Sequence, residues 1–425
     1  MSDSLDSADA RSRDERDVLA AFRERFVVAE EELIYLLGNS LGRLPRDTAG
    51  RLHDLVGVEW GERLIRGWND GWIGFPQATG DRLAGLLGAE PGEVLLADST
   101  SVNLYKLAVA ALRARPDRRR IVTDDLQFPS DLYALRSAMA AAGDGYELHI
   151  APSPDGCYGP VEALEAALDE NTALLALSHT VFKSAYTYDM AALTARAHAA
   201  GALALWDVSH SVGVWPLQFR ADGVDLAVGC TYKYLNGGPG APAFLYVRRE
   251  LQEQLQNPVA GWMGQEQPFE FELNYRPAAG LRRFLTGTPA VLSLLPVAFG
   301  VDLVLEAGIE RVRAKSVAQT EYLIALWEEQ LRPLGFELRT PREAARRASH
   351  VALAHPEGWR IAQALQAEMN VLLDFRRPDN LRLAAAPLYT TFQELHAAAS
   401  RLRRVVADRL YERYSPIVTE TKPVT

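Results

Sequence analysis

The alternation of short apolar runs and helical patterns between about residues 80 and 250 constrains the fold of this chain most strongly. Short segments predicted as strands, several of them apolar throughout, lie at 120–124, 146–151, 174–177, 203–207, 225–229 and 243–247. Apolar residues at helical spacing predict helices at 101–115, 130–142, 160–168 and 190–200. Such alternation is typical of an α/β fold in which helices cover both faces of a mostly parallel sheet.

The pattern changes after Pro289. Long helical runs at 290–306 and 309–331 precede a mixture of short strands and helices, at 336–339, 349–354, 358–368 and 392–410. This mixture predicts a smaller α+β domain. We therefore expect three parts: an N-terminal arm and helix over 1–60 that packs on the small domain, a large domain over 61–300, and a small domain over 301–425.

Composition argues against several kinds of protein. The formal net charge of −10 argues against a nucleic-acid-binding surface. No apolar stretch reaches the roughly 18 uncharged residues of a membrane span, and residues 1–25 lack the apolar core of a secretory signal. Two distant cysteines, Cys157 and Cys230, fit a reducing compartment such as the cytoplasm. The histidines show no metal-ligand spacing, so we expect no metal.

Two ionisable residues stand at the ends of predicted strands. Asp207 ends the run 203–207, and Lys233 follows the run 225–229 in a turn that leads into the glycine-rich segment 236–240. In an α/β sheet, strand ends present side chains to a ligand. Pyridoxal 5'-phosphate (PLP) needs a lysine that forms a Schiff base and a carboxylate that keeps the pyridine nitrogen protonated. Taken singly, Lys233 is equally a surface lysine and Asp207 a helix cap, but the pair favours the cofactor.

Two further segments stand at predicted helix starts. The segment 98–103 offers hydroxyl and backbone N–H groups to a phosphate, although a plain N-cap explains it equally well. Phe128 lies on a strand-to-helix turn, where its ring could stack on a cofactor. Ser130 and Asp131 follow it, and taken alone they are more simply explained as caps of the next helix.

Read in order, several segments resemble the kynureninase family. They are YLLGNSLG at 35–42, SVNL at 101–104, FPSD at 128–131, WDVSH at 206–210, YKY at 232–234 and GWMG at 261–264. The resemblance extends over nearly the whole chain. The Asp207–Lys233 pair alone indicates only PLP enzymes of fold type I, the aspartate aminotransferase fold, and the GNSLG, FPSD and GWMG segments narrow the choice. The resemblance implies a homodimer with shared active sites and a large domain built on a seven-stranded sheet.

The resemblance also implies roles for individual residues. Lys233 would form the Schiff base, Asp207 would bind the pyridine nitrogen with Asp131 nearby, and Phe128 would stack on the ring. The other residues implied around the cofactor are Thr100, Ser101, Ser178, His210 and Tyr232, joined by Trp262 and Thr288 from the second subunit. Some family members carry an asparagine in this last turn, which here reads Thr286-Gly287-Thr288, so either threonine is a candidate for the phosphate contact.

The implied substrate is L-kynurenine or 3-hydroxykynurenine. Arg382, in Asn380-Leu381-Arg382-Leu383, matches the arginine that holds the substrate carboxylate, and a planar guanidinium suits that task. Asn39 and Ser40 are further candidates for substrate binding. The implied reaction is hydrolysis to L-alanine and anthranilate, or 3-hydroxyanthranilate, in tryptophan catabolism, with Tyr232 as the general acid/base. Preference between the two substrates depends on one or two pocket contacts that the sequence does not reveal.

Two other functions stay open on the sequence. One is another PLP enzyme of the same fold, a class V aminotransferase or a cysteine desulfurase, although Cys157 and Cys230 are badly placed for a mobile catalytic cysteine. The other is a catalytically silent protein of that fold. The joint presence of Lys233, Asp207 and Arg382 argues against a silent protein.

Overall fold

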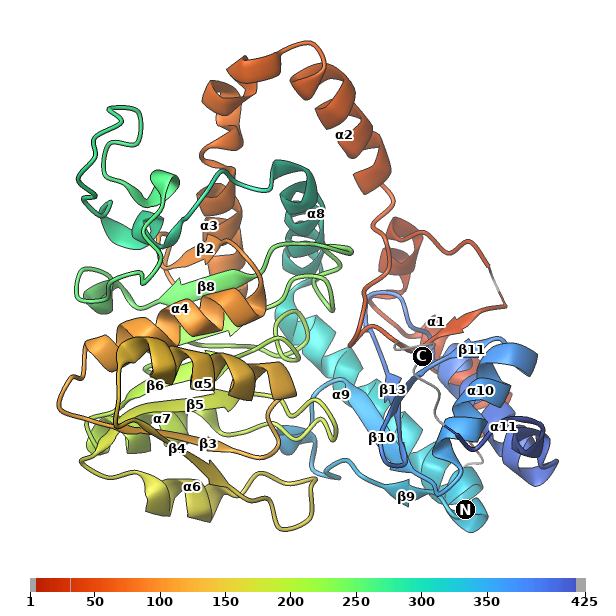
Figure 1. The fold of residues 1–425 in the computed structure, drawn as a ribbon. Coiled ribbons are helices and arrows are strands. Elements are labelled where there is room, and N and C mark those ends of the chain that lie inside the picture. Colours follow the sequence, from red (N-terminus) through yellow and green to blue (C-terminus); the bar gives the residue numbers. More distant parts are fainter. Residues whose placement is uncertain (1–4, 31, 418–425) are drawn as a thin grey trace.

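The computed structural model describes residues 5–30 and 32–417 (Figure 1). A seven-stranded sheet dominates the larger part of the molecule, with its strands in the order β2-β8-β7-β6-β5-β3-β4. Along the chain these strands are β2 (Val94–Leu96), β3 (Arg120–Asp124), β4 (Glu147–Ala151), β5 (Thr172–Ser178), β6 (Leu203–Asp207), β7 (Leu226–Gly229) and β8 (Phe244–Val247). β8 pairs antiparallel with both of its neighbours, and the other pairs are parallel. The predicted mostly parallel seven-stranded sheet is confirmed.

Alternate residues of the central strands enter two separate cores. In β6, Ala204 and Trp206 belong to one core, whereas Leu203 and Leu205 belong to the other. The alternation arises because successive Cβ atoms of a strand point to opposite faces of the sheet. Burial on both faces explains why these strands read in the sequence as continuous apolar runs.

Helices cover both faces of this sheet (Figure 1). One face is covered by α4 (Thr100–Arg113) and α5 (Pro129–Ala142), and the other by α3 (Phe75–Leu87), α6 (Val161–Ala167), α7 (Met190–Ala199) and α8 (Val291–Ala307). The hydroxyl oxygen of Ser99 caps α4 by accepting a hydrogen bond from the backbone N–H of Val102 at 3.4 Å. α5 begins with Pro129, whose fixed φ suits the first helical position. Both helix starts therefore lie just beyond strand ends.

A four-stranded antiparallel sheet, in the order β12-β13-β10-β9, forms the second part. Its strands are β9 (Glu337–Leu338), β10 (His350–Ala354), β12 (Asp374–Arg376) and β13 (Asn380–Ala384). This sheet shares a third core with α9 (Ile309–Leu326), α10 (Gly358–Glu368) and α11 (Phe392–Ala407). Neither β12 nor β13 was predicted, because the charged side chains of Asp374, Arg376 and Arg382 interrupt the apolar pattern of these strands.

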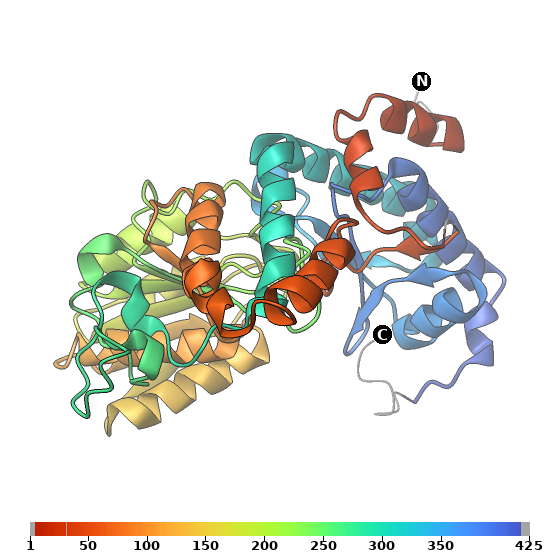
Figure 2. The ribbon, with the colours of Figure 1, turned by 90° about the horizontal axis from the view of Figure 1, so that it is seen from above.

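α8 and α9 link the two parts of the molecule (Figure 2). They meet at Gly308, whose φ of 80° is one that residues with a side chain rarely adopt. Gly300 lets α8 approach the loop after β7, because a Cβ at this position would lie 1.6 Å from the carbonyl oxygen of Leu235. Among the described residues, no single helix is long and apolar enough to cross a membrane. Taken together, 291–307 and 309–334 meet that test of length and composition, but they are bent by 83°.

The N-terminal segment contacts the second part and then crosses to the first. α1 (Ser7–Glu15) packs on α11, and Asp14 accepts a hydrogen bond from the backbone N–H of Phe392 at 2.7 Å. β1 (Ile34–Tyr35) pairs in parallel with β11 (Val371–Leu372). α2 (Thr48–Asp54) and the helical turns after it then arch over to α3 (Figures 1 and 2). Residues 1–4 of the predicted arm lie outside the described residues.

Candidate active site

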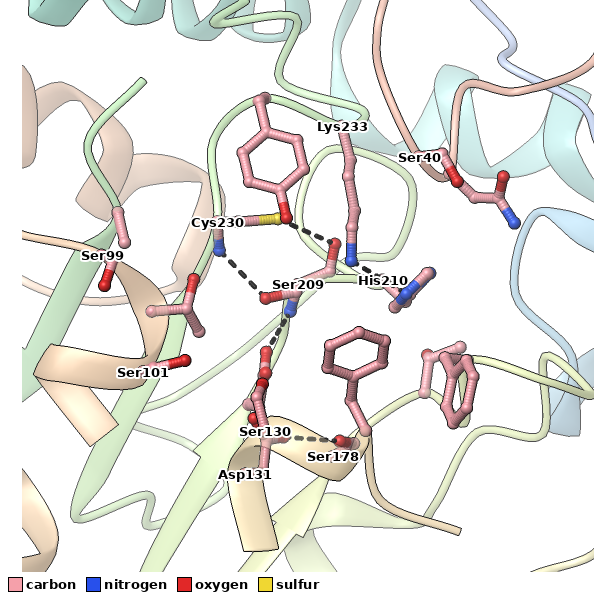
Figure 3. Close-up of a pocket in the computed structure, with 18 of the residues that line it drawn as sticks. Ser40, Ser99, Ser101, Ser130, Asp131, Ser178, Ser209, His210, Cys230 and Lys233 are labelled. Carbon is pink, nitrogen blue, oxygen red and sulfur yellow. Dashed lines mark hydrogen bonds between the residues drawn. The ribbon is translucent and has the colours of Figure 1, made fainter. Parts of the chain in front are cut away.

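A cavity of about 390 Å³ lies where the carboxyl ends of the large sheet's strands face β12 and β13. Most of the residues that the sequence singles out line it: Asn39, Ser40, Thr100, Ser101, Phe128, Asp131, Ser178, Asp207, His210, Tyr232, Lys233 and Arg382. Trp262 and Thr288 do not line it. Segments far apart in the chain therefore converge on one site, as Figure 3 shows for ten labelled residues.

The loop after β7 is folded so that Lys233 projects into the cavity (Figure 3). The Thr231 hydroxyl donates a hydrogen bond to the carbonyl oxygen of Pro242 at 2.7 Å, and the backbone N–H of Gly237 returns to the carbonyl oxygen of Thr231 at 2.9 Å. Gly42 packs on this loop, where a Cβ would lie 2.3 Å from the carbonyl oxygen of Lys233. The close approach to the backbone of Lys233 thus explains the second glycine of the GNSLG segment, Gly42.

Lys233 Nζ lies 2.9 Å from His210 Nε2. Burial, together with the nearby charge of Lys233, lowers the pKa of His210 well below its ordinary value. His210 is therefore neutral at pH 7, and its Nε2 can accept a hydrogen bond from the ammonium group of Lys233. Its Nδ1 is buried and has no hydrogen-bond partner among the described residues. The pair places a proton acceptor beside the amine without adding a second positive charge.

Asp207 and Asp131 form a buried carboxyl pair. Asp207 ends β6 beside Ser178 of β5, and its Oδ1 accepts a hydrogen bond from the backbone N–H of Ser209 at 2.6 Å. Asp131 lies in the first turn of α5, yet no side-chain cap hydrogen bond is formed there. Its carboxyl group instead approaches Asp207 and Ser178. Burial, and then the charge of Asp207, raise the pKa of Asp131 well above its ordinary value, so Asp131 holds its proton to a higher pH than an ordinary aspartate.

The start of α4 provides the most suitable place for a phosphate. Ser99, Thr100 and Ser101 all line the cavity at the N-terminus of this helix, where backbone N–H groups and the helix dipole favour an anion. Behind them, the buried Lys106 Nζ donates hydrogen bonds to Asp98 Oδ2 and to the carbonyl oxygen of Phe284, both at 2.7 Å. Lys106 therefore fixes the turn before α4 against the segment 280–284.

Two aromatic side chains lie at different sides of the site. Phe128 is 45% exposed and meets the ring of Phe182 edge to face, with 5.2 Å between ring centroids. Tyr232 lies beside Cys230, and this proximity, followed by burial, raises the pKa of the Tyr232 hydroxyl. Tyr232 is therefore protonated at pH 7 and can donate a proton or a hydrogen bond into the cavity. Phe128 has the exposed face that stacking on a planar ring requires.

Arg382 lies in β13 with its side chain buried. It forms an ion pair with Asp374, and its Nη1 donates a hydrogen bond to the carbonyl oxygen of Phe182 at 2.5 Å. Ser40 Oγ lies 3.4 Å from Arg382 Nη2 and donates to Asp374 Oδ2 at 2.8 Å. Both polar atoms of the Asn39 side chain are buried and lack a partner among the described residues. This end of the cavity thus combines a positive charge with unsatisfied amide groups, which suits a carboxylate.

The sequence is 41% identical to a kynureninase from Pseudomonas fluorescens over 403 residues, which cover 94% of this chain and 95% of that relative. The chain belongs to the kynureninase family. A kynureninase from Burkholderia pseudomallei is 40% identical over the same shares of the two chains. The family model described as the kynureninase C-terminal domain matches residues 312–402. The resemblance noted in the sequence is confirmed.

Solved structures extend the likeness at the level of the fold. A cysteine desulfurase from Thermococcus onnurineus superposes with a TM-score of 0.79 at 17% identity, covering 91% of this chain and 98% of that one. A C-DES variant solved with glycine linked covalently to its PLP cofactor superposes with a TM-score of 0.78 at 18% identity. The superposition covers 90% of this chain and 98% of that one. At such low identity the likeness establishes the type I fold alone, so membership of the kynureninase family rests on the sequence.

Trp262 and the 286–288 turn lie together, outside the cavity of their own chain. The backbone N–H of Met263 donates to the carbonyl oxygen of Thr286 at 3.1 Å, and Trp262 is 44% exposed. The Trp262 indole N–H donates to the carbonyl oxygen of Pro268 at 2.5 Å, and its ring stacks on Phe271. The predicted role of Trp262 and the 286–288 turn across a kynureninase dimer stays a prediction.

Ser99 lines the cavity within the segment 98–103 that was predicted to suit a phosphate. Sequence reasoning assigned no role in the site to Ser130, Thr180, Phe182, Ser209, Cys230, Ala241, Ala243 and Arg376. Ser209 lies inside the WDVSH segment, so the signal was present and was not assigned. Arg376 had no such signal, because Arg376 and Arg377 read as two surface charges. Its position follows only from the pairing of β12 with β13.

Proposed function

We propose that this chain hydrolyses L-kynurenine to anthranilate and L-alanine, and 3-hydroxykynurenine to 3-hydroxyanthranilate and L-alanine. In this reaction the Cβ–Cγ bond breaks, water supplies a hydroxyl group to the acyl carbon, and Cβ gains a proton. Membership of the kynureninase family, at 41% identity over 94% of the chain, carries this proposal. It is supported by the convergence of Lys233, Asp207 and Arg382 on one cavity.

The residues present fit PLP. Lys233 would bind its aldehyde carbon, Asp207 its pyridine nitrogen and Phe128 one face of its ring, with Thr100 and Ser101 at the phosphate. The raised pKa of Asp131 lowers the negative charge that the Asp131–Asp207 pair carries, which suits one pyridinium group. When bound, PLP supplies an electron sink for charge that develops on the substrate carbons.

The side chains of the chain itself then bind the substrate and move protons. Arg382 would hold the substrate α-carboxylate, with Asn39 and Ser40 beside it. The Lys233 amine would remove the proton from the substrate Cα, and the neutral His210 beside it keeps a hydrogen-bond acceptor within 2.9 Å. Tyr232, protonated at pH 7, would donate a hydrogen bond to the carbonyl oxygen and a proton to Cβ.

The active enzyme is proposed to be a homodimer. Trp262 and either Thr286 or Thr288 would reach the phosphate of the neighbouring subunit. Exposed apolar side chains around Trp262 support a covered surface, because Phe271 is 72% and Leu273 102% exposed. Inactive Lys233→Ala and Trp262→Ala subunits should therefore regain activity when mixed, since some hybrid sites combine two intact contributions. Subunit exchange without recovered activity would contradict shared sites.

Two observations weigh against the rival functions. A cysteine desulfurase needs an accessible cysteine. Cys157 is buried outside the cavity, Cys230 lines the cavity but is only 3% exposed, and burial raises the pKa of each thiol. A silent protein has no need to keep Lys233 beside a neutral histidine and two carboxyl groups. We also propose a cytoplasmic location, which both free cysteines fit.

The test is hydrolysis by purified, PLP-loaded protein. L-kynurenine should yield anthranilate and L-alanine in equal amounts, and Lys233→Ala should abolish both products. Parallel kinetics with 3-hydroxykynurenine would fix the substrate preference. Dependence on an added α-keto acid, or release of sulfide from cysteine with no anthranilate from kynurenine, would assign the chain to another reaction of the same fold.

A further inference from the structure

Two neighbouring strands bring a carboxylate and two guanidinium groups to one wall of the cavity. Asp374 of β12 lies directly opposite Arg382 of β13 in the antiparallel register. Arg376 lies two residues after Asp374, so both side chains leave β12 on the same face. Directly opposed residues lie about 5 Å apart at Cβ, which allows their side chains to pair. The sheet itself therefore assembles this triad.

The carboxylate of Asp374 lies behind the cavity wall and holds both arginines. It forms ion pairs with Arg382 Nη2 through Oδ2 and with Arg376 Nη1 through Oδ1, the second at 2.8 Å. Ser40 adds a hydrogen bond to Oδ2 at 2.8 Å. Asp374 is 1% exposed, and it does not line the cavity, whereas Arg376 and Arg382 do. Asp374 therefore positions the two arginines and does not itself bind a ligand.

The two guanidinium groups of the triad keep unsatisfied hydrogen-bonding capacity. The Nε atoms of Arg376 and Arg382 are both buried, and neither has a hydrogen-bond partner among the described residues. A buried donor without a partner costs about 1–3 kcal/mol, so an acceptor that satisfies both is favoured. Two guanidinium groups and one carboxylate also leave one excess positive charge in the triad. One substrate carboxylate matches this charge, and both arginines line the cavity that would hold it.

We propose that Arg376 is a second substrate-binding guanidinium, held by Asp374, which shares the substrate α-carboxylate with Arg382. This inference rests on the proposed function, because it places an amino-acid substrate in the cavity. The Arg376 side chain is 29% exposed, so it reaches the cavity from a less enclosed position than Arg382. Arg382 would bind the carboxylate from the buried side, and Arg376 would bind it from the more exposed side.

The test compares two ligands that differ only in the carboxylate. One is L-kynurenine, and the other is its decarboxylated analogue, which keeps the amine and the aryl ketone. Binding is followed by the change in cofactor absorbance of the PLP-loaded protein. Arg376→Met should weaken kynurenine binding about ten-fold or more, equivalent to about 1.4 kcal/mol, and should leave the analogue unchanged. Arg376→Lys keeps the charge but loses the planar guanidinium fork. Its affinity for kynurenine should therefore lie between that of the parent and that of Arg376→Met.

Arg377→Met is the matched control, because it removes the same charge from the next residue, which is exposed and does not line the cavity. This control should bind both ligands as the parent does. Equal weakening of both ligands by Arg376→Met, or no weakening of kynurenine, would overturn the proposal. The binding readout needs no turnover, so absence of kynurenine hydrolysis would refute the proposed function while leaving this test of Arg376 valid.

Discussion

The buried carboxyl pair behind the cofactor site leads to opposite expectations for two similar substitutions. Asp131→Asn and Asp207→Asn each replace one carboxyl oxygen by an amide group of the same size. Burial and the charge of Asp207 raise the pKa of Asp131 well above its ordinary value, so Asp131 is expected to act as the proton-donating member of the pair. An asparagine at 131 can still donate to Asp207. An asparagine at 207 removes the negative charge itself.

The expected losses of kcat fall in two separate ranges. Loss of a hydrogen bond between charged groups costs about 1.5–3 kcal/mol, so Asp207→Asn should lower kcat by about ten- to 150-fold. Asp131→Asn exchanges one neutral donor for another, so its effect should stay within about 1 kcal/mol, or about five-fold. Steady-state kinetics with L-kynurenine at saturating PLP measures both values.

The pH dependence of stability provides an independent readout. The pKa of Asp131 is higher in the folded protein than its ordinary value of 3.8. Below pH 3.8 the carboxyl group is protonated in both the folded and the unfolded states. As pH rises from there toward the folded pKa, only the unfolded state releases the proton, and this release lowers the free energy of the unfolded state. The folded protein therefore loses stability as pH rises from 3.8 to the pKa of Asp131 in the folded state. The loss is about 1.4 kcal/mol for each pH unit in that range.

Asparagine does not titrate, so Asp131→Asn removes this loss. Thermal unfolding of the cofactor-free protein, scanned at one rate between pH 5 and 8, should show a shallower fall in Tm for Asp131→Asn than for the parent. Damage to kcat by Asp131→Asn as severe as that by Asp207→Asn would mean that Asp131 works as an anion. That result, or an unchanged pH dependence of Tm, would refute the reasoning.

Three further predictions concern other parts of the site. Arg382→Lys keeps the charge but loses the planar fork, so KM for L-kynurenine should rise about ten-fold or more while bound PLP is unchanged; kinetics equal to the parent would place the carboxylate elsewhere. Lys106→Met leaves Asp98 and the Phe284 carbonyl oxygen without their partner. The change should lower the free energy of unfolding by about 3 kcal/mol and the calorimetric Tm by about 3 °C, and an unchanged Tm would show that the pair is not stabilising. Tyr232→Phe should lower kcat by about 100-fold with the cofactor absorbance retained, and activity near that of the parent would exclude Tyr232 as the proton donor.

The sequence predicted the central sheet well for a physical reason. Strands such as β6 and β7 are buried on both faces, so their apolar runs match the strand bounds closely. The order of the strands is set by packing between segments distant in the chain, and it could not be predicted from local pattern. The three predicted domain ranges, 1–60, 61–300 and 301–425, stay predictions.

Polar residues of the site were harder to predict, because local pattern offers several explanations for each. Asp131 reads as a helix cap, yet its carboxyl group approaches Asp207. Asp374 and Arg376 read as surface charges in a short charged segment, and only the register of β12 with β13 brings them to Arg382. Lys106 stands in an otherwise apolar stretch of α4, and a charge at such a position is a usable signal of a buried pair.

Borohydride reduction of the PLP-loaded protein, followed by tryptic digestion and mass spectrometry, tests the central claim most directly. A lysine that carries reduced PLP resists trypsin, so modification of Lys233 should join residues 221–233 and 234–248 into one peptide that carries the cofactor. The unreduced protein should give the two peptides separately. Recovery of the cofactor on Lys183, Lys106 or any other lysine would contradict the placement of Lys233 opposite Asp207 as the core of this active site.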